Sequence, residues 1–417
     1  MARSNVALHS AMNIKPRTSM ADYLLSIFLY ISIVLPSGSI LGINVKIISL
    51  LLFFLGLLLL RHGVIIPKII MSLVPIFVFL FLELTLSLFF LQYDDSYMIA
   101  QAKDIFVFFL MFYVCIIFAE NRNGLESLMD KITSSIFVVG IIKILILVYS
   151  FVTGIQISTV IQKIADIYNV SIMSFDVEDS SISRINFTSD SIIFICIFYL
   201  FMKMFRGKFS KKDILYLMVI CFSALITMSR FQWATCLASI LFAVLINVRK
   251  KKSFIVMVLV CAAAVFSLSF QSVQEMITTR FDQKLVSSSD GARDLQRVGI
   301  EKKIDQSPIL GNGIGYYIPD VIRSSDAKYS YELQLLALIM QLGMIGFLAV
   351  MIMILLPLLK AALGMSIITY CCFTIMTFVW ISGALFNPIL FSSSAGAAMA
   401  ALYAIAKIPW MQKSEKI

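Results

Sequence analysis

Long apolar runs recur along this sequence, and they constrain its fold more than any other feature. Each run has the length of about 20 residues that a helix needs to cross a hydrocarbon core roughly 30 Å thick. Hydrophobic residues make up 60% of the 417 positions and charged residues only 14%, whereas about a quarter of the residues in a soluble globular protein are charged. The sequence therefore predicts an all-α polytopic membrane protein and excludes a soluble enzyme.

Twelve of these runs are predicted to span the membrane. The basic connectors 203–212 and 249–252 are expected in the cytoplasm by the positive-inside rule. The 153–187 connector and the long 271–330 connector are expected on the outer side, and a loop as long as the second is usually functional. Both termini are then cytoplasmic, and residues 1–417 form a single integral membrane domain. The expected spans are 22–36, 43–60, 69–91, 101–119, 132–152, 188–203, 214–229, 231–248, 254–270, 331–358, 365–386 and 388–407.

The net charge of +10 does not indicate nucleic-acid binding, because the Lys and Arg residues concentrate in connectors between apolar runs. All seven cysteines lie within apolar runs, and no CxxC pattern indicates a metal or redox site. No cluster of carboxylates on the expected outer side favours a metal either. The sequence predicts no cofactor.

Two ionisable side chains lie well inside predicted spans, Glu83 in the third and Lys143 in the fifth. A charge within the membrane costs several kcal/mol unless it is paired or hydrated. Both residues are expected between mid-membrane and the outer half, so they could pair with each other. The pair fits either a structural role or the lining of a substrate cavity, and it is also compatible with a transporter.

The most polar part of the chain is the stretch from Asp290 to Gly346. Ser289 or Asp290 is expected to cap a helix that runs to about Asp305, and Pro308 then ends it. Arg293 and Arg297 share one face of this helix. Glu301 is a local partner for Arg297, whereas Arg293 lacks one downstream and is expected to be the freer of the two to meet a ligand.

Arginine at a membrane interface suits a phosphate ligand, because its planar fork matches two phosphate oxygens at once. Arg230 is expected there, in the short outer turn 228–233, although an arginine at a helix end also occurs for snorkelling alone. Gly311, Gly313 and Gly315 follow a helix and not a strand, so they form neither a dinucleotide fingerprint nor a P-loop. They fit a tight turn that re-enters the interface or a backbone nest for an anion.

The order of these features resembles the Wzy-type O-antigen polymerases and the related O-antigen ligases. The family pattern has Ser-Arg at a short outer turn, then an Arg about fifteen residues before a Pro-x-x-Gly-x-Gly run, then a His-Asn-x-x-Leu-Gln-like segment and a helix with Gly-x-Ile-Gly. The chain supplies Ser229-Arg230, Arg293 before Pro308, Gly311 and Gly313, the 332–336 segment with Gln334, and Gly343-Met-Ile-Gly346.

The resemblance implies a GT-C-like glycosyltransferase architecture of about twelve helices with one long periplasmic loop. It also implies metal-independent transfer with inversion, from an undecaprenyl-diphosphate-linked glycan donor to a lipid-linked acceptor. Arg230 and Arg293 would stabilise the leaving diphosphate, and Glu332 would accept the proton of the acceptor hydroxyl. The expected substrate-binding residues are Arg297, Gly311, Gly313, Gly315, Tyr316, Tyr331 and Gln334, while Tyr317 and Tyr329 could also stack on sugars or simply belong to an interfacial belt.

One departure from the family pattern favours a polymerase over a ligase. Glu332 stands where ligases carry the His thought to activate the acceptor, and the only histidines, His9 and His62, are expected in the cytoplasm. The alternatives are an O-antigen ligase, a lipid-linked oligosaccharide flippase, and a peptidoglycan polymerase or other lipid-sugar polymerase. The resemblance places the protein in the bacterial inner membrane, with a chain-length regulator as a conceivable protein partner and no nucleic acid.

Overall fold

A computed structural model shows that the described chain is helical. It describes residues 20–35, 44–60, 63–90, 95–122, 124–168, 185–251, 253–255, 257–258, 274, 278, 283–323 and 327–412. Within these ranges every regular element is an α-helix or a short 3-10 helix, and no strand occurs. The all-α prediction is confirmed.

The described helices fall into two groups along the chain, one before and one after the long connector. The first group is α1 (Met20–Val34), α2 (Val45–Leu59), α3 (Ile65–Phe90), α4 (Asp95–Asn121), α5 (Leu125–Thr153), α6 (Ile157–Tyr168), η1 (Thr188–Ile192), α7 (Ile193–Phe205), α8 (Lys211–Ile226) and α9 (Arg230–Ile246). The second group is α12 (Gln283–Gln306), α13 (Gln334–Ala362), α14 (Ile367–Ser382), η2 (Gly383–Leu385), α15 (Ser393–Lys407) and η3 (Pro409–Met411).

Eleven of the twelve predicted spans coincide with helices, and the ninth, 254–270, lies almost entirely outside the described residues. By length and composition, six helical segments of the described chain can cross a membrane: Ile65–Phe89, Ser96–Asn121, Leu125–Thr153, Thr188–Phe205, Gln334–Ala362 and Ile367–Leu385. Met20–Val34, Val45–Leu59 and Arg230–Ile246 are shorter apolar helices. These helices fit a polytopic membrane protein, while the number of twelve crossings stays a prediction.

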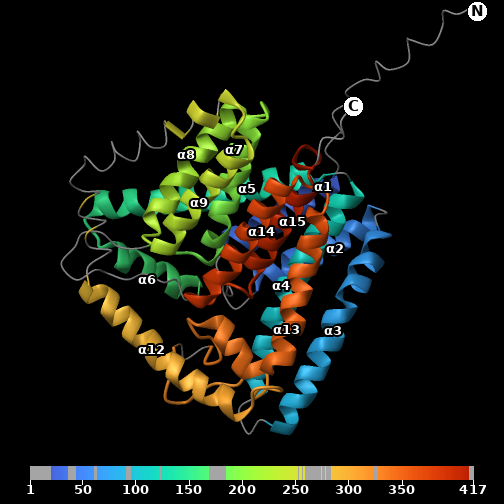
Figure 1. Ribbon diagram of the computed structural model, residues 1–417, viewed down its shortest axis with the longest axis vertical. Helices are drawn as coiled ribbons and strands as arrows, with labels where there is room; N and C mark the ends of the chain where they lie inside the picture. The colour runs from blue at the N-terminus through green and yellow to red at the C-terminus, as the bar shows by residue number, and fades with distance from the viewer. Residues whose placement is uncertain are drawn as a thin grey trace, which may run out of the picture.

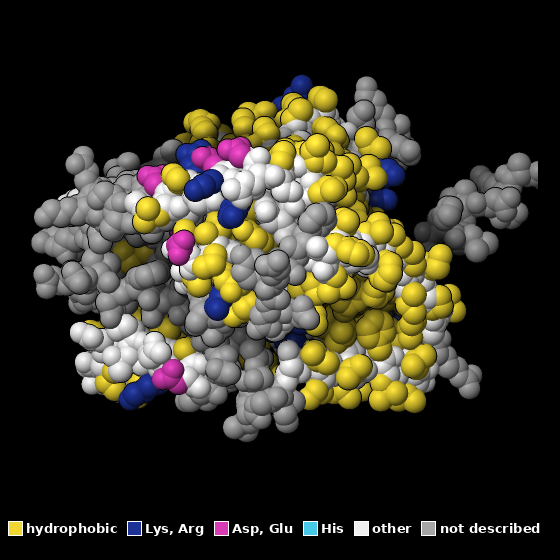
Figure 2. Space-filling model, turned by 90° about the horizontal axis from the view of Figure 1, so that it is seen from below, with side chains coloured by type: hydrophobic (Ala, Val, Ile, Leu, Met, Phe, Trp, Pro, Cys, Tyr) yellow, Lys and Arg dark blue, Asp and Glu magenta, His cyan; other side chains and the backbone are white. Residues whose placement is uncertain are grey.

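Helix α3 is apolar on both its buried face and its exposed face, as is typical of a helix that contacts lipid. Its residues Ile69, Leu73 and Ile76 are buried, while Phe77 and Phe81 are 51% and 70% exposed. In water such a face would be an interaction surface, but against lipid it needs no partner. Figure 2 views the molecule from the end that carries α12, and hydrophobic side chains cover much of one side, whereas charged side chains gather near the middle of the view.

The centre of the fold is α15, a helix made mostly of Ala, Ser and Gly. It packs against α4, α13, α5 and η1, and nearly all of its residues are buried. A Cβ at Gly396 would collide with the backbone carbonyl of Phe108 on α4. Small residues let helix backbones approach closely without the hydrophobic effect, so this composition explains why α15 occupies the middle (Figure 1).

Helix α12 and the loop that follows it lie together at the lower end of the molecule in Figure 1, with α12 packed on α13. The expected start of α12 is wrong: the helix begins at Gln283, so Ser289 and Asp290 lie inside it and do not cap it. Its end at Gln306 agrees with the stop expected from Pro308.

The glycine-rich loop, residues 308–315, packs on a break in α13. Gly343 has φ 64° and ψ 179°, which interrupts the helix. The loop fills the break with backbone hydrogen bonds: the Gly313 N–H donates to the Gln341 carbonyl at 2.8 Å, and the Met344 N–H donates to the Pro308 carbonyl at 2.9 Å. A Cβ on Gly311 or Gly343 would collide with the other segment's backbone. Both glycine motifs are therefore needed for one main-chain contact.

The pair of Glu83 and Lys143 that the sequence suggested does not form. Lys143 Nζ lies 2.7 Å from Asp190 Oδ1, and the two side chains are 0% and 4% exposed. Glu83 is buried against Gly346 and has no ion-pair partner among the described residues. The prediction was wrong because Asp190 belongs to η1, a 3-10 turn at the position where the sequence pattern indicates only the edge of a plain span.

Candidate functional site

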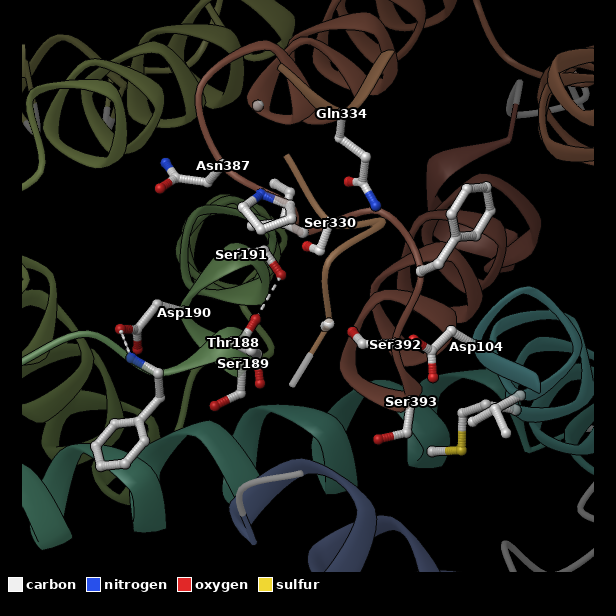
Figure 3. A pocket seen from close by; sticks show the side chains of 18 of the residues that line it. Asp104, Thr188, Ser189, Asp190, Ser191, Ser330, Gln334, Asn387, Ser392 and Ser393 are labelled. Carbon is white, nitrogen blue, oxygen red and sulfur yellow. Dashed lines mark hydrogen bonds between the residues drawn. The ribbon is translucent and has the colours of Figure 1, made fainter. Parts of the chain in front are cut away.

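A cavity of about 670 Å³ lies where α4, η1, α13 and the segment before α15 meet. Its volume is within the range of roughly 300–1,000 Å³ that is usual for small-molecule sites. Figure 3 shows side chains from these separate elements converging on it, among them Asp104, Asp190, Gln334 and Ser393.

The cavity wall combines aromatic rings with many hydroxyl and amide groups. The rings include Phe187, Phe231, Trp380, Tyr329, Tyr331 and Phe391, and the residues with hydroxyls and amides include Ser32, Asn44, Gln101, Thr188, Ser330, Gln334, Asn387, Ser392 and Ser393. Rings that present flat apolar faces beside hydrogen-bonding groups suit an amphipathic ligand. Such a wall can hold a sugar or a polar lipid headgroup.

Three charged side chains form a cluster beside this cavity. Arg293 Nε on α12 donates to Glu332 Oε2 at 2.9 Å, and Arg323 Nε lies 3.7 Å from Glu332 Oε1. The side chains are 16–25% exposed: Arg323 16%, Arg293 23% and Glu332 25%. Among the described residues the cluster brings two guanidinium groups to one carboxylate, and guanidinium groups at a cavity can also bind an anion.

The cluster corrects one expectation from the sequence. Arg293 was expected to be freer than Arg297, but it pairs with Glu332, which lies far along the chain. The expected pair of Arg297 with Glu301 is confirmed at 3.0 Å, and both of those side chains are more than half exposed. Pairing across 39 positions depends on how α12 folds back onto the start of α13, which local spacing does not reveal.

Arg323 is the member of the cluster that sequence reasoning missed. It lies in the loop between α12 and α13 and is the one of the three that lines the cavity. Burial lowers the pKa of its guanidinium, and Arg293 lowers it further, while Glu332 raises it. An arginine stays charged over this range, so Arg323 is held as a cation at the cavity wall. The sequence did contain one signal that could have identified Arg323: it is an arginine in the polar loop shortly before Glu332.

Arg230 is the first residue of α9 and follows Ser229, whose side chain caps the helix by accepting from the Gln232 N–H. Ser229 and Gln232 line the cavity, whereas Arg230 does not. The structure therefore places the Ser-Arg turn at the cavity, with the serine facing it and the arginine outside its wall.

Two of the expected substrate-binding residues, Tyr331 and Gln334, line the cavity. Tyr331 is fully buried, and its hydroxyl accepts from the Ile318 N–H at 2.7 Å. Gln334 opens α13 and accepts from the Leu390 N–H at 2.8 Å. Tyr316 is also buried but outside the wall, with Lys303 Nζ 6.0 Å from its ring centre.

The backbone N–H groups of the glycine run are already used by the protein. The Gly311 N–H donates to the Ser307 carbonyl at 3.1 Å and that of Gly313 to Gln341. The Gly315 N–H donates to Gln101 Oε1 on α4. These donors are not available to an anion in this structure, so the arrangement favours the tight turn over the nest.

A chain of hydrogen bonds ties this loop to α4 near the cavity. Gln341 donates to the backbone carbonyls of Tyr316 and Tyr329, each at 2.9 Å, and accepts from Gln101 Nε2 at 2.6 Å. The Tyr329 hydroxyl donates to Asp104 Oδ2 at 2.7 Å. Burial and then the Asp104 carboxylate raise the pKa of Tyr329 well above its usual range, so this hydroxyl stays the donor.

Residues 215–351 match the family model described as O-Antigen ligase (Wzy_C), which spans α8 to the middle of α13. The match covers about a third of the chain and includes the turn, the loop and the glycine motifs. It is consistent with a Wzy-type member of the O-antigen polymerase/ligase superfamily, and it confirms the resemblance seen in the sequence. No curated protein matches the chain. Polymerase or ligase activity in O-antigen assembly is what this family supports.

Proposed function

Given the family match over residues 215–351, we propose that the protein polymerises undecaprenyl-diphosphate-linked repeat units into O-antigen at the periplasmic face of the bacterial inner membrane. A hydroxyl of an incoming lipid-linked repeat unit attacks the anomeric carbon of the growing lipid-linked chain. The bond from that carbon to the diphosphate oxygen breaks, undecaprenyl diphosphate leaves, and a base accepts the hydroxyl proton.

The observation that carries the proposal is the Arg293–Glu332–Arg323 cluster beside the cavity. A leaving diphosphate develops negative charge, and preorganised cations stabilise it without rearranging at the moment of reaction. Arg323 reaches the cavity wall, while Arg293, which pairs with Glu332, and Arg230, which follows the cavity-lining Ser229, are further phosphate-binding candidates. Glu332 pairs with Arg293 and lies 3.7 Å from Arg323, which holds the two cluster arginines in place, and the resemblance to the family makes it one candidate for the proton acceptor.

The O-antigen ligase is the alternative that the family description favours. Polymerase and ligase differ in their acceptor, a lipid-linked repeat unit or the lipid A core. Glu332 in place of a ligase-type His supports the polymerase. Charged side chains are scarce inside the predicted spans and one connector is long; this counts against a flippase, which usually has short outer loops and charges distributed along a central cavity.

The test is complementation of a host that lacks its own polymerase and makes the cognate repeat unit. We expect the wild-type chain to restore a ladder of sugar chains on lipopolysaccharide gels. Arg323→Ala and Arg293→Ala should reduce the ladder to single repeats at normal protein levels. Single repeats made by the wild type itself would refute the polymerase, and a glycan that reaches lipid A only with this protein would establish the ligase.

A further inference from the structure

Glycosyl transfer of this kind uses a base that accepts the acceptor's proton, and three described carboxylates lie at or beside the cavity: Asp104, Asp190 and Glu332. A proton acceptor must come within hydrogen-bond reach of the substrate hydroxyl, and a carboxylate oxygen without a protein partner can do so without giving up a contact. The contacts of the three differ, and they allow a choice.

Glu332 is the most heavily engaged with cations. Arg293 Nε donates to Glu332 Oε2 at 2.9 Å, and Arg323 Nε lies 3.7 Å from Glu332 Oε1. The Glu332 side chain is not part of the cavity wall. To accept a proton from a sugar it would have to give up an ion pair and turn away from both arginines.

Asp190 lines the cavity but is fixed at both oxygens. Its Oδ1 accepts from Lys143 Nζ at 2.7 Å, and its Oδ2 accepts from the Phe187 N–H at 2.8 Å. The side chain is 4% exposed. These bonds hold η1 in place, so Asp190 shapes the wall and has no oxygen to offer.

Asp104 on α4 also lines the cavity, and its contacts are different. Its Oδ2 accepts from the Tyr329 hydroxyl at 2.7 Å. Its Oδ1 lies 4.0 Å from Lys103 Nζ, beyond hydrogen-bond reach, and has no other partner in the part of the chain that the structure describes. The Asp104 side chain is 37% exposed. One oxygen is therefore oriented by the protein, and the other can meet a ligand (Figure 3).

The surroundings hold Asp104 rigidly. Gln101 lies one helical turn before it on the same face of α4 and bonds to Gln341 and to the glycine-rich loop. Gln341 in turn holds the backbone of Tyr329. The glycine-rich loop, α13 and α4 thus jointly set the angle of the Tyr329 hydroxyl and, through it, of the Asp104 carboxylate.

We propose that Asp104 accepts the proton of the attacking acceptor hydroxyl, while the arginine cluster at Glu332 receives the leaving diphosphate. The hydroxyl proton moves to Asp104 Oδ1 as the new C–O bond forms and the C–O bond to the diphosphate breaks. Tyr329 is a positioning residue that keeps Oδ2 occupied. This assignment rests on the proposed transferase function and divides the site into an acceptor side on α4 and a leaving-group side at the loop.

The test uses the purified full chain in detergent, with lipid-linked repeat units extracted from the polymerase-null host as donor and acceptor. Asp104→Asn keeps the size of the side chain but removes the proton acceptor, so turnover should fall at least about a hundredfold while KM stays within about twofold. Asp104→Glu should recover part of the rate. Tyr329→Phe should lower turnover by about tenfold. Asp166→Asn, the same change at an exposed position on α6, should leave the rate unchanged.

The outcomes separate this inference from the proposed function. If the wild type polymerises and Asp104→Asn does so at an undiminished rate, Asp104 is not the base and the polymerase stands. If Glu332→Gln abolishes turnover with unchanged KM and Asp104→Asn does not, the base is Glu332. A wild-type chain that transfers only to lipid A core refutes the polymerase, and Asp104→Asn is then assayed with that acceptor, where retained transfer overturns the inference.

Discussion

Two ion-pair clusters stand at the same cavity, and their surroundings differ. The Lys143–Asp190 pair between α5 and η1 is almost completely buried, and Asp190 has both oxygens satisfied. The Arg293–Glu332–Arg323 cluster is partly exposed, and among the described residues it has two arginines for one carboxylate. A closed and balanced pair holds structure, whereas an open and unbalanced one can exchange an internal contact for a ligand. Burial and charge balance, and not the presence of an ion pair, distinguish the two roles.

The largest expected effect comes from breaking the buried pair on one side. Lys143→Met should leave the Asp190 carboxylate buried without its cation, and such changes destabilise proteins by about 3–5 kcal/mol. We expect a much lower thermal midpoint in detergent, measured by loss of the monodisperse peak in size-exclusion chromatography. The matched double variant Lys143→Met/Asp190→Asn should recover most of the loss. A single variant as stable as wild type would contradict the structural role of this pair.

The open cluster should behave in the opposite way. Arg323→Ala should lower turnover by about a hundredfold to a thousandfold, as is usual when one group that stabilises developing negative charge is removed. Its thermal midpoint should fall by only a few degrees, because Glu332 keeps Arg293. Arg323→Lys is the matched control, because it retains the charge without the planar fork. Its turnover should lie between those of the wild type and Arg323→Ala. A large loss of stability with little loss of turnover would reverse the comparison.

The loop that carries the open cluster depends on the break in α13. Gly343→Ala puts a Cβ at a residue with positive φ, against the backbone of Ile309 and Gly311. Strain of this kind costs on the order of 1–3 kcal/mol, so we expect lower stability and a displaced loop, seen as faster proteolysis. Gly291→Ala is the control on exposed α12, where a Cβ meets nothing, and it should stabilise the protein slightly.

Periodicity and composition were sufficient to predict most of the helices. Apolar runs located eleven helices, because an apolar segment in a bilayer must satisfy its own backbone hydrogen bonds and a helix does so. Pro308 marked the end of α12 correctly. Its start was misplaced because Ser and Asp favour helix caps but also occur within helices, and no local signal shows that the helix continues upstream of Asp290.

The site was less accessible to sequence reasoning because its contacts are long-range. The family pattern drew attention to Arg293, Glu332 and the glycines, but it contains neither Arg323 nor Asp104. These residues join the cavity only when the loop docks on α13 and α4 through Gln101 and Gln341. The sequence suggested Glu83 as the partner of Lys143 because both are expected at similar depth in the membrane. The observed partner is Asp190, which the 3-10 helix η1 positions beside Lys143.

The smallest expected effect concerns Arg297, which sequence reasoning placed among the substrate-binding residues. Its side chain is 61% exposed and pairs with Glu301 one turn along α12, an arrangement that contributes about 0.3–0.5 kcal/mol on a helix surface. Arg297→Ala should therefore change the equilibrium constant of unfolding and the turnover rate by less than about twofold each. The comparison with Arg293→Ala is direct, because the two arginines share one helix and differ in whether they reach Glu332. A turnover loss as large as that of Arg293→Ala would mean that exposure does not exclude a role here, and that a lipid-linked diphosphate contacts α12 outside the cavity.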